Sequence, residues 1–298
     1  MAGKALRHKF EAMALKAALG LFGALPLERA SAFGAFIAGT LGPRLGVTNR
    51  ARANMARAIP ELAPAEREAI IKKMWRNLGR TIGEYAHLHE FQLPAHRDKL
   101  GLSGTENLSV MEERDKGAIF ISGHFGNWEI APLIGRLYGL EGAEIYRHAN
   151  NPYVDEWMVG LRARAITPLQ IPKGSKGARE ILKVLKEKKS LYMLVDQKMN
   201  EGLETTFFGH KAMTTAAPAG LAVRYGVPIY PISFRRLGES TGFAMKVNPP
   251  ILADENADTF EEIARITQAM NDFLEGEIRA HPEQWFWLHN RWPKHPKP

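Results

Sequence analysis

The stretch GAIFISGHFGNWE, residues 117–129, decides the fold. Its first six residues form an apolar run of the length typical of a buried β-strand, and residues 127–138 have the spacing of a helix. Gly123 and Gly126 lie between the two and permit a tight turn. Because ligands bind at the carboxyl ends of strands in open α/β sheets, His124 in this turn is a candidate functional residue.

The same alternation continues toward the C-terminus. Strand-like and helical runs alternate there, and the last strand is expected to pair back across a turn at residues 238–242. This spacing predicts an α/β fold with a mixed, largely parallel central sheet and helices on both faces. The expected strands are 143–147, 190–196, 227–236 and 242–250, and the expected helices are 153–164, 178–188, 216–225 and 259–280.

The N-terminal region has a different character. Residues 17–27 and 31–45 are apolar but separated by Pro26, Glu28 and Arg29, so neither reaches the ~18–20 apolar residues that a bilayer span needs. We expect a membrane-associating helical hairpin over residues 1–45, with cationic residues at the lipid head groups. Those residues are Lys4, Arg7, His8, Lys9 and Lys16.

Two other interpretations of this region stay open. The runs could be ordinary buried helices, or a secretory signal cleaved near Ala30-Ser31-Ala32. Residues 46–298 are expected to form the second domain, which begins with helices over about residues 50–91 divided by Pro60 and Pro64.

Composition narrows the chemistry. The 298 residues include 40 Lys and Arg against 32 Asp and Glu, a net charge of +8, which suits an anionic partner or simply a basic solvated surface. There is no cysteine, which excludes thiol nucleophiles, thiolate zinc sites and disulfides. We predict no cofactor and no metal, since His281, His289 and His295 lack the spacing of zinc ligands. No nucleic-acid recognition module is present.

His124 and Glu129 together suggest acid–base chemistry. Asn127 is a plausible N-cap, which places Glu129 in the first helical turn, from where its carboxylate could reach back to the imidazole. A carboxylate on one ring nitrogen fixes the histidine tautomer, and the other nitrogen can then deprotonate a hydroxyl. The alternative is that Glu129 only favours the helix N-terminus and His124 is a turn residue.

The motif GHFGNWE resembles the His-x4-Asp/Glu motif of glycerolipid acyltransferases, and its flanks are similar to those of the lipid A late acyltransferases, the lauroyl and myristoyl transferase group. The resemblance covers roughly residues 100–295. Further matching segments are Tyr146-Arg147 with Asn150-Asn151-Pro152, the pair Arg162 and Arg164, Val195-Asp196-Gln197, Phe207-Phe208-Gly209 with Thr214-Thr215 and Pro218, and residues 283–292, EQWFWLHNRW.

The resemblance implies a function and a mechanism. Such an enzyme moves an acyl chain from acyl carrier protein to a hydroxyl of a lipid A precursor, and it works on the cytoplasmic face of the inner membrane as a peripheral or monotopic protein. His124 would be the general base and Glu129 its orienting partner, with no acyl-enzyme. The implied substrate-binding residues are Arg164, Arg162, Arg147, Asp196, Gln197 and Asn127.

Two other functions remain as alternatives. One is acyl-CoA-dependent transfer to another glycolipid or lysophospholipid, such as a phosphatidylinositol mannoside. The other is a non-catalytic basic protein that binds anionic lipid.

Three further segments carry a choice of interpretation. A basic group, comprising Arg179, Lys183, Lys186, Lys188 and Lys189, could dock the carrier protein or be a solvated helix face. The aromatic residues Trp285, Phe286, Trp287 and Trp292 could lie in the core or at the membrane interface, and we favour the core. The G-x-S-x-G pattern at residues 238–242 predicts a hairpin turn rather than a hydrolase elbow, because a strand follows it.

Overall fold

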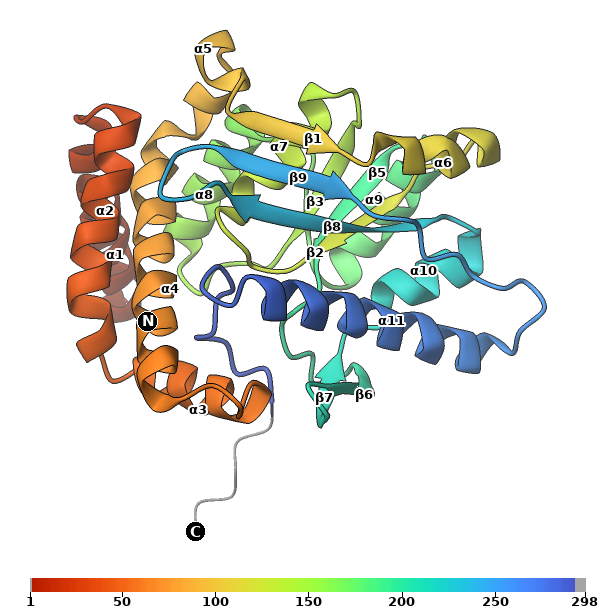
Figure 1. Ribbon diagram of the computed structural model, residues 1–298. Coiled ribbons are helices and arrows are strands. Elements are labelled where there is room, and N and C mark those ends of the chain that lie inside the picture. Colours follow the sequence, from red (N-terminus) through yellow and green to blue (C-terminus); the bar gives the residue numbers. More distant parts are fainter. Residues whose placement is uncertain (1, 293–298) are drawn as a thin grey trace.

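The computed structural model describes the backbone of residues 2–292, and their side chains except those of residues 2, 175 and 176. A seven-stranded sheet lies at its centre, with strand order β1-β9-β8-β2-β5-β3-β4, and a separate two-stranded sheet pairs β6 with β7 (Figure 1). The strands are β1 (Leu100–Ser103), β2 (Ile119–Ser122), β3 (Gly142–Tyr146), β4 (Gln170–Pro172), β5 (Ser190–Leu194), β6 (Leu203–Phe207), β7 (His210–Thr214), β8 (Ile229–Arg236) and β9 (Phe243–Val247).

The expectation of a mixed, largely parallel sheet flanked by helices is confirmed. In the seven-stranded sheet, strands β8, β2, β5, β3 and β4 pair in parallel, as do β1 and β9, whereas β8 and β9 pair antiparallel. The separate β6–β7 pair is also antiparallel. The α-helices are α1 (Ala2–Gly23), α2 (Leu27–Leu41), α3 (Thr48–Ala58), α4 (Pro64–Glu84), α5 (Pro94–Arg97), α6 (Ser109–Arg114), α7 (Ala131–Leu137), α8 (Pro152–Ala165), α9 (Ser175–Lys186), α10 (Ala217–Tyr225) and α11 (Thr259–Ala280).

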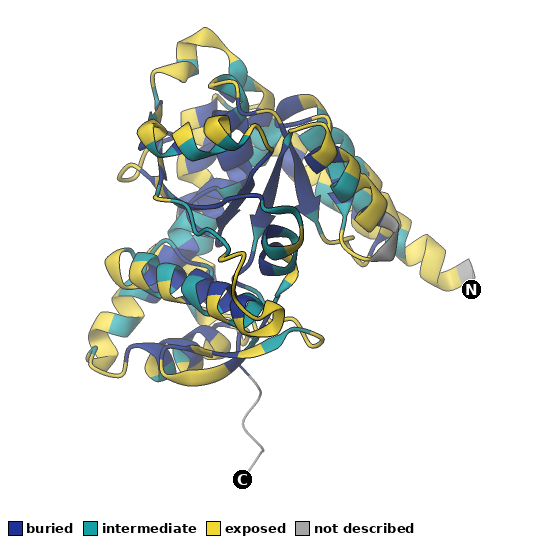
Figure 2. Cartoon of the chain, turned by 90° about the vertical axis from the view of Figure 1, so that its right-hand side faces the viewer, coloured by how far each residue is buried: buried dark blue, intermediate teal, exposed yellow. Residues whose placement is uncertain are grey.

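The central strand β2 shows why helices cover both faces. Ile119 and Ile121 point to one side, where they join the core that includes residues of α9, α10 and α11. Phe120 points to the other side and stacks between Tyr192 and Tyr230, in the core that includes α7. A parallel strand that is apolar on both faces must be covered on both, and Figure 2 shows the strands as the most buried part of the chain.

Helix α2 is joined closely to α4 at one end of the sheet (Figure 1). A Cβ on Gly79 would lie 2.1 Å from the carbonyl oxygen of Gly34, and a Cβ on Gly83 would lie 2.3 Å from that of Ala30. Only glycine permits this backbone approach. The hydroxyl of Ser31 donates to Glu84 over 2.7 Å inside the contact, so the helix pair crosses the expected boundary at residue 45.

The N-terminal hairpin keeps many apolar side chains exposed. Its first helix extends from the body in Figure 2. Within residues 2–292, no helix combines the length and the apolar character that crossing a bilayer requires. The exposed apolar residues of α1 and α2 are Leu6, Phe10, Met13, Leu21, Phe33, Phe36, Ile37 and Leu41.

Several local expectations need revision. The helix after the turn begins as a 3-10 turn, Trp128–Ile130, and Asn127 makes no side-chain cap. The short strands β1, β4, β6 and β7 are additions to the expected set, and each has at least one residue that is not buried. Residues 238–242 do form the turn of the β8–β9 hairpin.

The aromatic C-terminal segment lies in the core, as favoured over the membrane interface. The three indole side chains of this segment are almost completely buried. They are those of Trp285, Trp287 and Trp292.

Candidate active site

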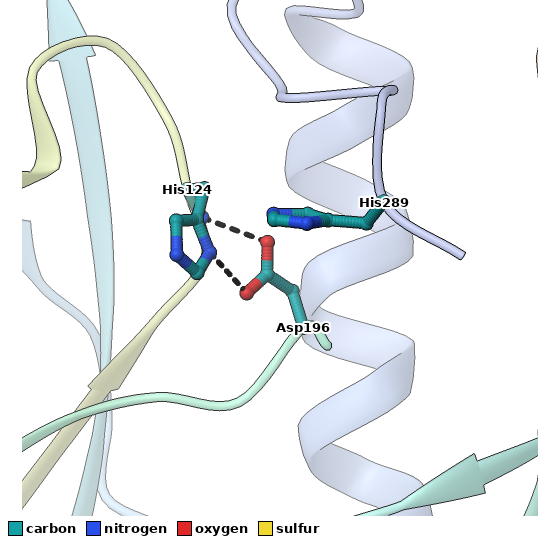
Figure 3. A group of neighbouring side chains, drawn as sticks. All are labelled: His124, Asp196 and His289. Atoms are coloured by element: carbon teal, nitrogen blue, oxygen red, sulfur yellow. Dashed lines mark hydrogen bonds and ion pairs between the residues drawn. The ribbon is translucent and has the colours of Figure 1, made fainter. Parts of the chain in front are cut away.

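His124 and Asp196 meet at the carboxyl ends of the two central strands. Ser122 of β2 lies opposite Leu194 of β5, and each functional residue comes two positions later. The Nδ1 of His124 lies 2.7 Å from Oδ1 of Asp196, and the backbone N–H of His124 donates to Oδ2 over 2.8 Å (Figure 3). The register of a parallel strand pair therefore builds this contact.

Asp196 is held in its ionised form. It is fully buried, and it also accepts a hydrogen bond from Nε1 of Trp285 at 2.8 Å. Burial alone would raise the pKa of Asp196, but the charge and hydrogen bonds of His124 outweigh it and lower that pKa well below its usual range. An ionised carboxylate only accepts, so the nitrogen of His124 that carries a proton toward Asp196 is Nδ1, and in the neutral imidazole the lone pair is on Nε2.

The free nitrogen of His124 faces Gln197 and a second histidine. The amide Nε2 of Gln197 lies 3.2 Å from Nε2 of His124 and 3.3 Å from Nε2 of His289. Figure 3 shows the ring of His289 directed at the pair formed by His124 and Asp196. Burial and the neighbouring His124 lower the pKa of His289 to about 3, so this imidazole is neutral.

Glu129 does not orient His124, which corrects the expectation for this pair. Its carboxylate takes two hydrogen bonds from Arg162, both at 2.6 Å, one from Nε1 of Trp128 at 3.1 Å and one from the hydroxyl of Tyr85. Glu129, in the 3-10 turn, pairs with Arg162 of α8, whereas His124 pairs with Asp196 after β5, although both line the same cavity. Burial would raise the pKa of Glu129, but Arg162 lowers it.

A second buried carboxylate lies close to this ion pair. Glu144 of β3 accepts a hydrogen bond from the Gln170 amide at 3.0 Å. Burial and the negative charge of Glu129 raise the pKa of Glu144 to about 7. Glu144 therefore titrates near neutrality although it lines the same cavity as His124.

The other expected substrate-binding residues divide into two groups. Arg147, Arg162 and Gln197 line the cavity beside His124. Arg164 does not, because residues two apart on a helix point about 200° away from each other, and its side chain is exposed. Asn127 is fully buried and donates to Glu84 over 2.9 Å, so it holds the loop instead of facing the cavity.

Two neighbouring cavities share part of their lining close to His124. The first, the His124 cavity, has a volume of about 310 Å³ and is lined by His124, Trp128 and Arg147 among others. The second, the α9–α10 groove, has about 760 Å³ and apolar walls from both helices. The two share lining residues, which are Ile145, Arg147, Lys173, Leu194 and Gln197.

The same side chains could hold a metal ion. His124, Asp196 and His289 offer ligand atoms that lie within 4.8 Å of one another. An ion there would take donor atoms from both members of the His124–Asp196 pair. His281 lies elsewhere, beside Arg235, and His295 falls outside the described residues.

Sequence reasoning missed the roles of Trp285 and His289. Both belong to the segment EQWFWLHNRW, where the only available signal was its resemblance to a family signature. The segment is anchored from α3, since the Nδ2 of Asn54 donates to the carbonyls of Trp287 and His289 at 2.8 and 2.7 Å. The backbone N–H of Phe286 donates to the carbonyl of His124, which holds this segment next to the site.

Comparison with known proteins gives one matching family and several relatives. Residues 4–294 match the family described as bacterial lipid A biosynthesis acyltransferase. The chain is 26% identical to the lipid A biosynthesis palmitoleoyltransferase of Escherichia coli, over 86% of this chain and 85% of that protein. It is 23% identical to the lauroyltransferase of the same organism, over 82% and 78%. It is also 22% identical to the phosphatidylinositol mannoside acyltransferase of Mycolicibacterium smegmatis, over 89% and 86%.

Proposed function

The chain belongs to the bacterial lipid A biosynthesis acyltransferase family, and on that premise we propose that it transfers a fatty acyl chain from a thioester donor directly to a hydroxyl of a lipid A precursor. The His124–Asp196 pair carries this proposal. Asp196 fixes the imidazole with Nε2 unprotonated and directed into the His124 cavity.

The reaction needs no covalent enzyme intermediate. Nε2 of His124 takes the proton of the acceptor hydroxyl as its oxygen attacks the thioester carbonyl. The tetrahedral intermediate expels the thiolate, which takes the proton back from the imidazolium. The amide of Gln197 contacts Nε2 of His124 in the structure. When the acceptor binds, its hydroxyl replaces this contact, and Gln197 keeps its contact with His289.

The α9–α10 groove suits the acyl chain. It shares lining residues with the His124 cavity and has side chains of Ile181, Met193 and Leu221 along it. A chain lying there places its thioester at the junction, beside His124. Exclusion of the acyl chain from water favours binding by about 0.8 kcal/mol for each buried methylene.

We propose that acyl carrier protein is the donor and that the reaction takes place on the cytoplasmic face of the inner membrane. The basic residues of α9 and the following turn are mostly exposed, which suits an acidic partner. The exposed apolar side chains of α1 and α2, such as Phe10 and Phe36, suit peripheral attachment to the bilayer. No helix within residues 2–292 is expected to span it.

A second candidate acceptor is supported by one comparison. The mycobacterial relative is named a phosphatidylinositol mannoside acyltransferase, so transfer from acyl-CoA to another glycolipid is the alternative. Both reactions use the same dyad.

The test is acyl transfer by the purified chain in mixed micelles. Acyl carrier protein and CoA thioesters are compared as donors, and a lipid A precursor and a phosphatidylinositol mannoside as acceptors. We expect transfer to the lipid A precursor from the carrier protein, abolished by His124→Ala. Transfer that persists in His124→Ala would refute the mechanism, and a preference for the mannoside would refute the acceptor.

A further inference from the structure

A group of arginines lies apart from the His124 cavity, next to the β8–β9 turn. Arg76 and Arg80 are one turn apart on α4 and converge on Glu239 of that turn. Lys73, three residues before Arg76, and Arg235 extend the basic surface. Cavities of about 540 and 400 Å³ lie around this point, and both are lined by Arg80 and Glu239.

The charges at this point are poorly balanced. The Arg80 side chain is only 7% exposed, whereas Glu239, the carboxylate facing it at 3.2 Å, is 64% exposed. Glu239 is shared with Arg76, which binds it at 2.6 Å. The next arginine, Arg236, is already neutralised by Glu84. Arg80 contacts Glu239 through one nitrogen and the hydroxyl of Ser31 through the other, at 3.2 and 3.3 Å. Burial and the charge of Arg236 lower the pKa of Arg80 although Glu239 and Glu84 act in the opposite direction.

We propose that Arg76 and Arg80 form a binding site for a phosphate group of a membrane lipid, and that Glu239 occupies this site when the lipid is absent. Glu239 is 64% exposed, so water can solvate its carboxylate when it leaves the two arginines. A phosphate offers several charged oxygens to two guanidinium forks at once, which one carboxylate cannot match. Gly238, with φ of 58°, lies next to Glu239 in this turn.

The position of the site indicates a lipid source. Glu28 and Ala32 of α2 line the smaller cavity. The following outward residues of α2, Phe33 and Phe36, are 49% and 63% exposed apolar side chains. With this face of α2 on a bilayer, as proposed above, the cavity meets the level of the lipid phosphates. The phosphate belongs either to a bilayer phospholipid or to the acceptor glycolipid.

Vesicle binding tests the site without catalysis. The full chain is mixed with phosphatidylcholine vesicles with and without phosphatidylglycerol. Glu239→Gln is compared with Glu61→Gln, which has the same net charge and also breaks an exposed ion pair, with Arg279. Arg76→Gln is compared with Arg52→Gln, which breaks an exposed pair with Glu68.

We expect Glu239→Gln to bind the anionic vesicles severalfold more tightly than Glu61→Gln, and Arg76→Gln severalfold more weakly than Arg52→Gln. Equal binding within each pair would show that only net charge matters and would overturn the proposal. Urea unfolding of all four variants confirms that they are folded. A chain that binds in this way but transfers no acyl group would contradict the proposed function and leave the phosphate site standing.

A second measurement separates the two sources of phosphate. Transfer is followed with a phosphorylated acceptor and with the same acceptor lacking phosphate, in neutral detergent. If the acceptor supplies the phosphate, Arg76→Gln raises KM for the phosphorylated acceptor. The difference in KM between the acceptors with and without phosphate then becomes smaller. If the bilayer supplies it, that difference is the same in Arg76→Gln as in Arg52→Gln, while the vesicle result remains.

Discussion

The indole N–H of Trp285 donates to Oδ2 of Asp196 over 2.8 Å, so the carboxylate that holds His124 is itself held by the C-terminal segment. The donor on one oxygen and the imidazole on the other leave Asp196 no freedom to rotate. A carboxylate fixed in this way keeps the imidazole in one tautomer, which is the condition for His124 to act as a base.

Asp196→Asn should reduce kcat by about 10³- to 10⁴-fold, as loss of the orienting carboxylate does in histidine-based hydrolases. An amide in this position no longer compels Nδ1 of His124 to carry the proton. Steady-state kinetics measures the loss. Asp98→Asn, at an exposed position, is the control and should retain the parental rate. Near-parental activity in Asp196→Asn would refute the role given to this carboxylate.

Glu129→Gln should act mainly on stability. The substitution leaves the Arg162 guanidinium buried without a full counter-charge, which costs about 3 kcal/mol of unfolding free energy. The pKa of Glu129 is lowered in the fold, so its stabilisation is present above the unfolded value near 4.5 and is lost on acidification below it. Urea unfolding from pH 7 to pH 3 should therefore show a smaller acid-dependent loss in the variant.

The same variant distinguishes Glu129 from Asp196 in catalysis. If Glu129 only supports the loop, the pH dependence of kcat/KM keeps its shape in Glu129→Gln. A displaced acid limb in that profile would indicate that Glu129 acts on His124 after all.

Glu84→Gln should lower kcat more than its effect on stability explains. Glu84 accepts hydrogen bonds from Asn127 of the His124 loop and from Arg236. In a glutamine, an NH₂ group replaces one of the two accepting oxygens, so the N–H group that faces it loses its acceptor. We expect a 10- to 100-fold loss, about what a slight displacement of a catalytic group causes. The control is Glu262→Gln, a buried carboxylate paired with Arg265 on α11, far along the chain from the loop.

A compensating change makes this prediction sharper. Combining Glu84→Gln with Asn127→Asp restores a donor–acceptor pair with the charge on the other residue. Recovery of kcat in the double variant supports positioning through this contact. Equal kcat losses in Glu84→Gln and Glu262→Gln would instead mean that general destabilisation is the cause.

Glu144 should make the protein less stable as the pH rises. Its pKa is about 7 in the fold against 4.5 unfolded, because burial and Glu129 disfavour its charge. The folded state therefore binds more protons between these values, and the stability it contributes below pH 4.5 is lost as pH rises through 7. In Glu144→Gln, unfolding free energies from pH 5 to pH 8 should be flatter. An unchanged slope would contradict the assigned pKa.

Gly220→Leu should shift the enzyme toward shorter acyl chains. Gly220 lines the α9–α10 groove, and a Cβ added there meets nothing within 4 Å, so a larger side chain projects into the groove without disturbing the fold. Competition between thioesters of different chain length measures the shift. Gly276→Leu, on the exposed side of α11, is the control. An unchanged preference in Gly220→Leu would place the acyl chain elsewhere.

The centre of the sheet was predictable because strands such as β2 are apolar on both faces. The apolar run at 117–122 predicts a strand that is covered by helices on both faces, and β2 is such a strand. Helix α11 was expected at its observed ends, 259–280. The short edge strands escaped because a three-residue segment such as β4 carries no periodicity of its own. Its extended form comes from pairing with β3.

The site was half predictable. A histidine at the end of a central strand follows from the sequence, but its partner was assigned by proximity along the chain. Strand register decides otherwise, since residue 196 lies 72 positions away yet follows the adjacent strand. Arg162 and Arg164 were expected together, and helical geometry separates them. No sequence rule available from a single chain connects Trp285 to Asp196.

The anchoring of Asp196 by Trp285 also fixes when the enzyme becomes competent during synthesis. Residues 124, 196, 285 and 289 leave the ribosome in that order, and the contacts between them span most of the chain. These contacts cannot form before both of the segments that they join have been synthesised. A nascent chain arrested before residue 285 therefore has its first helices made but its catalytic carboxylate without its indole donor. We therefore expect a chain that ends before this segment to lack the proposed acyl transfer.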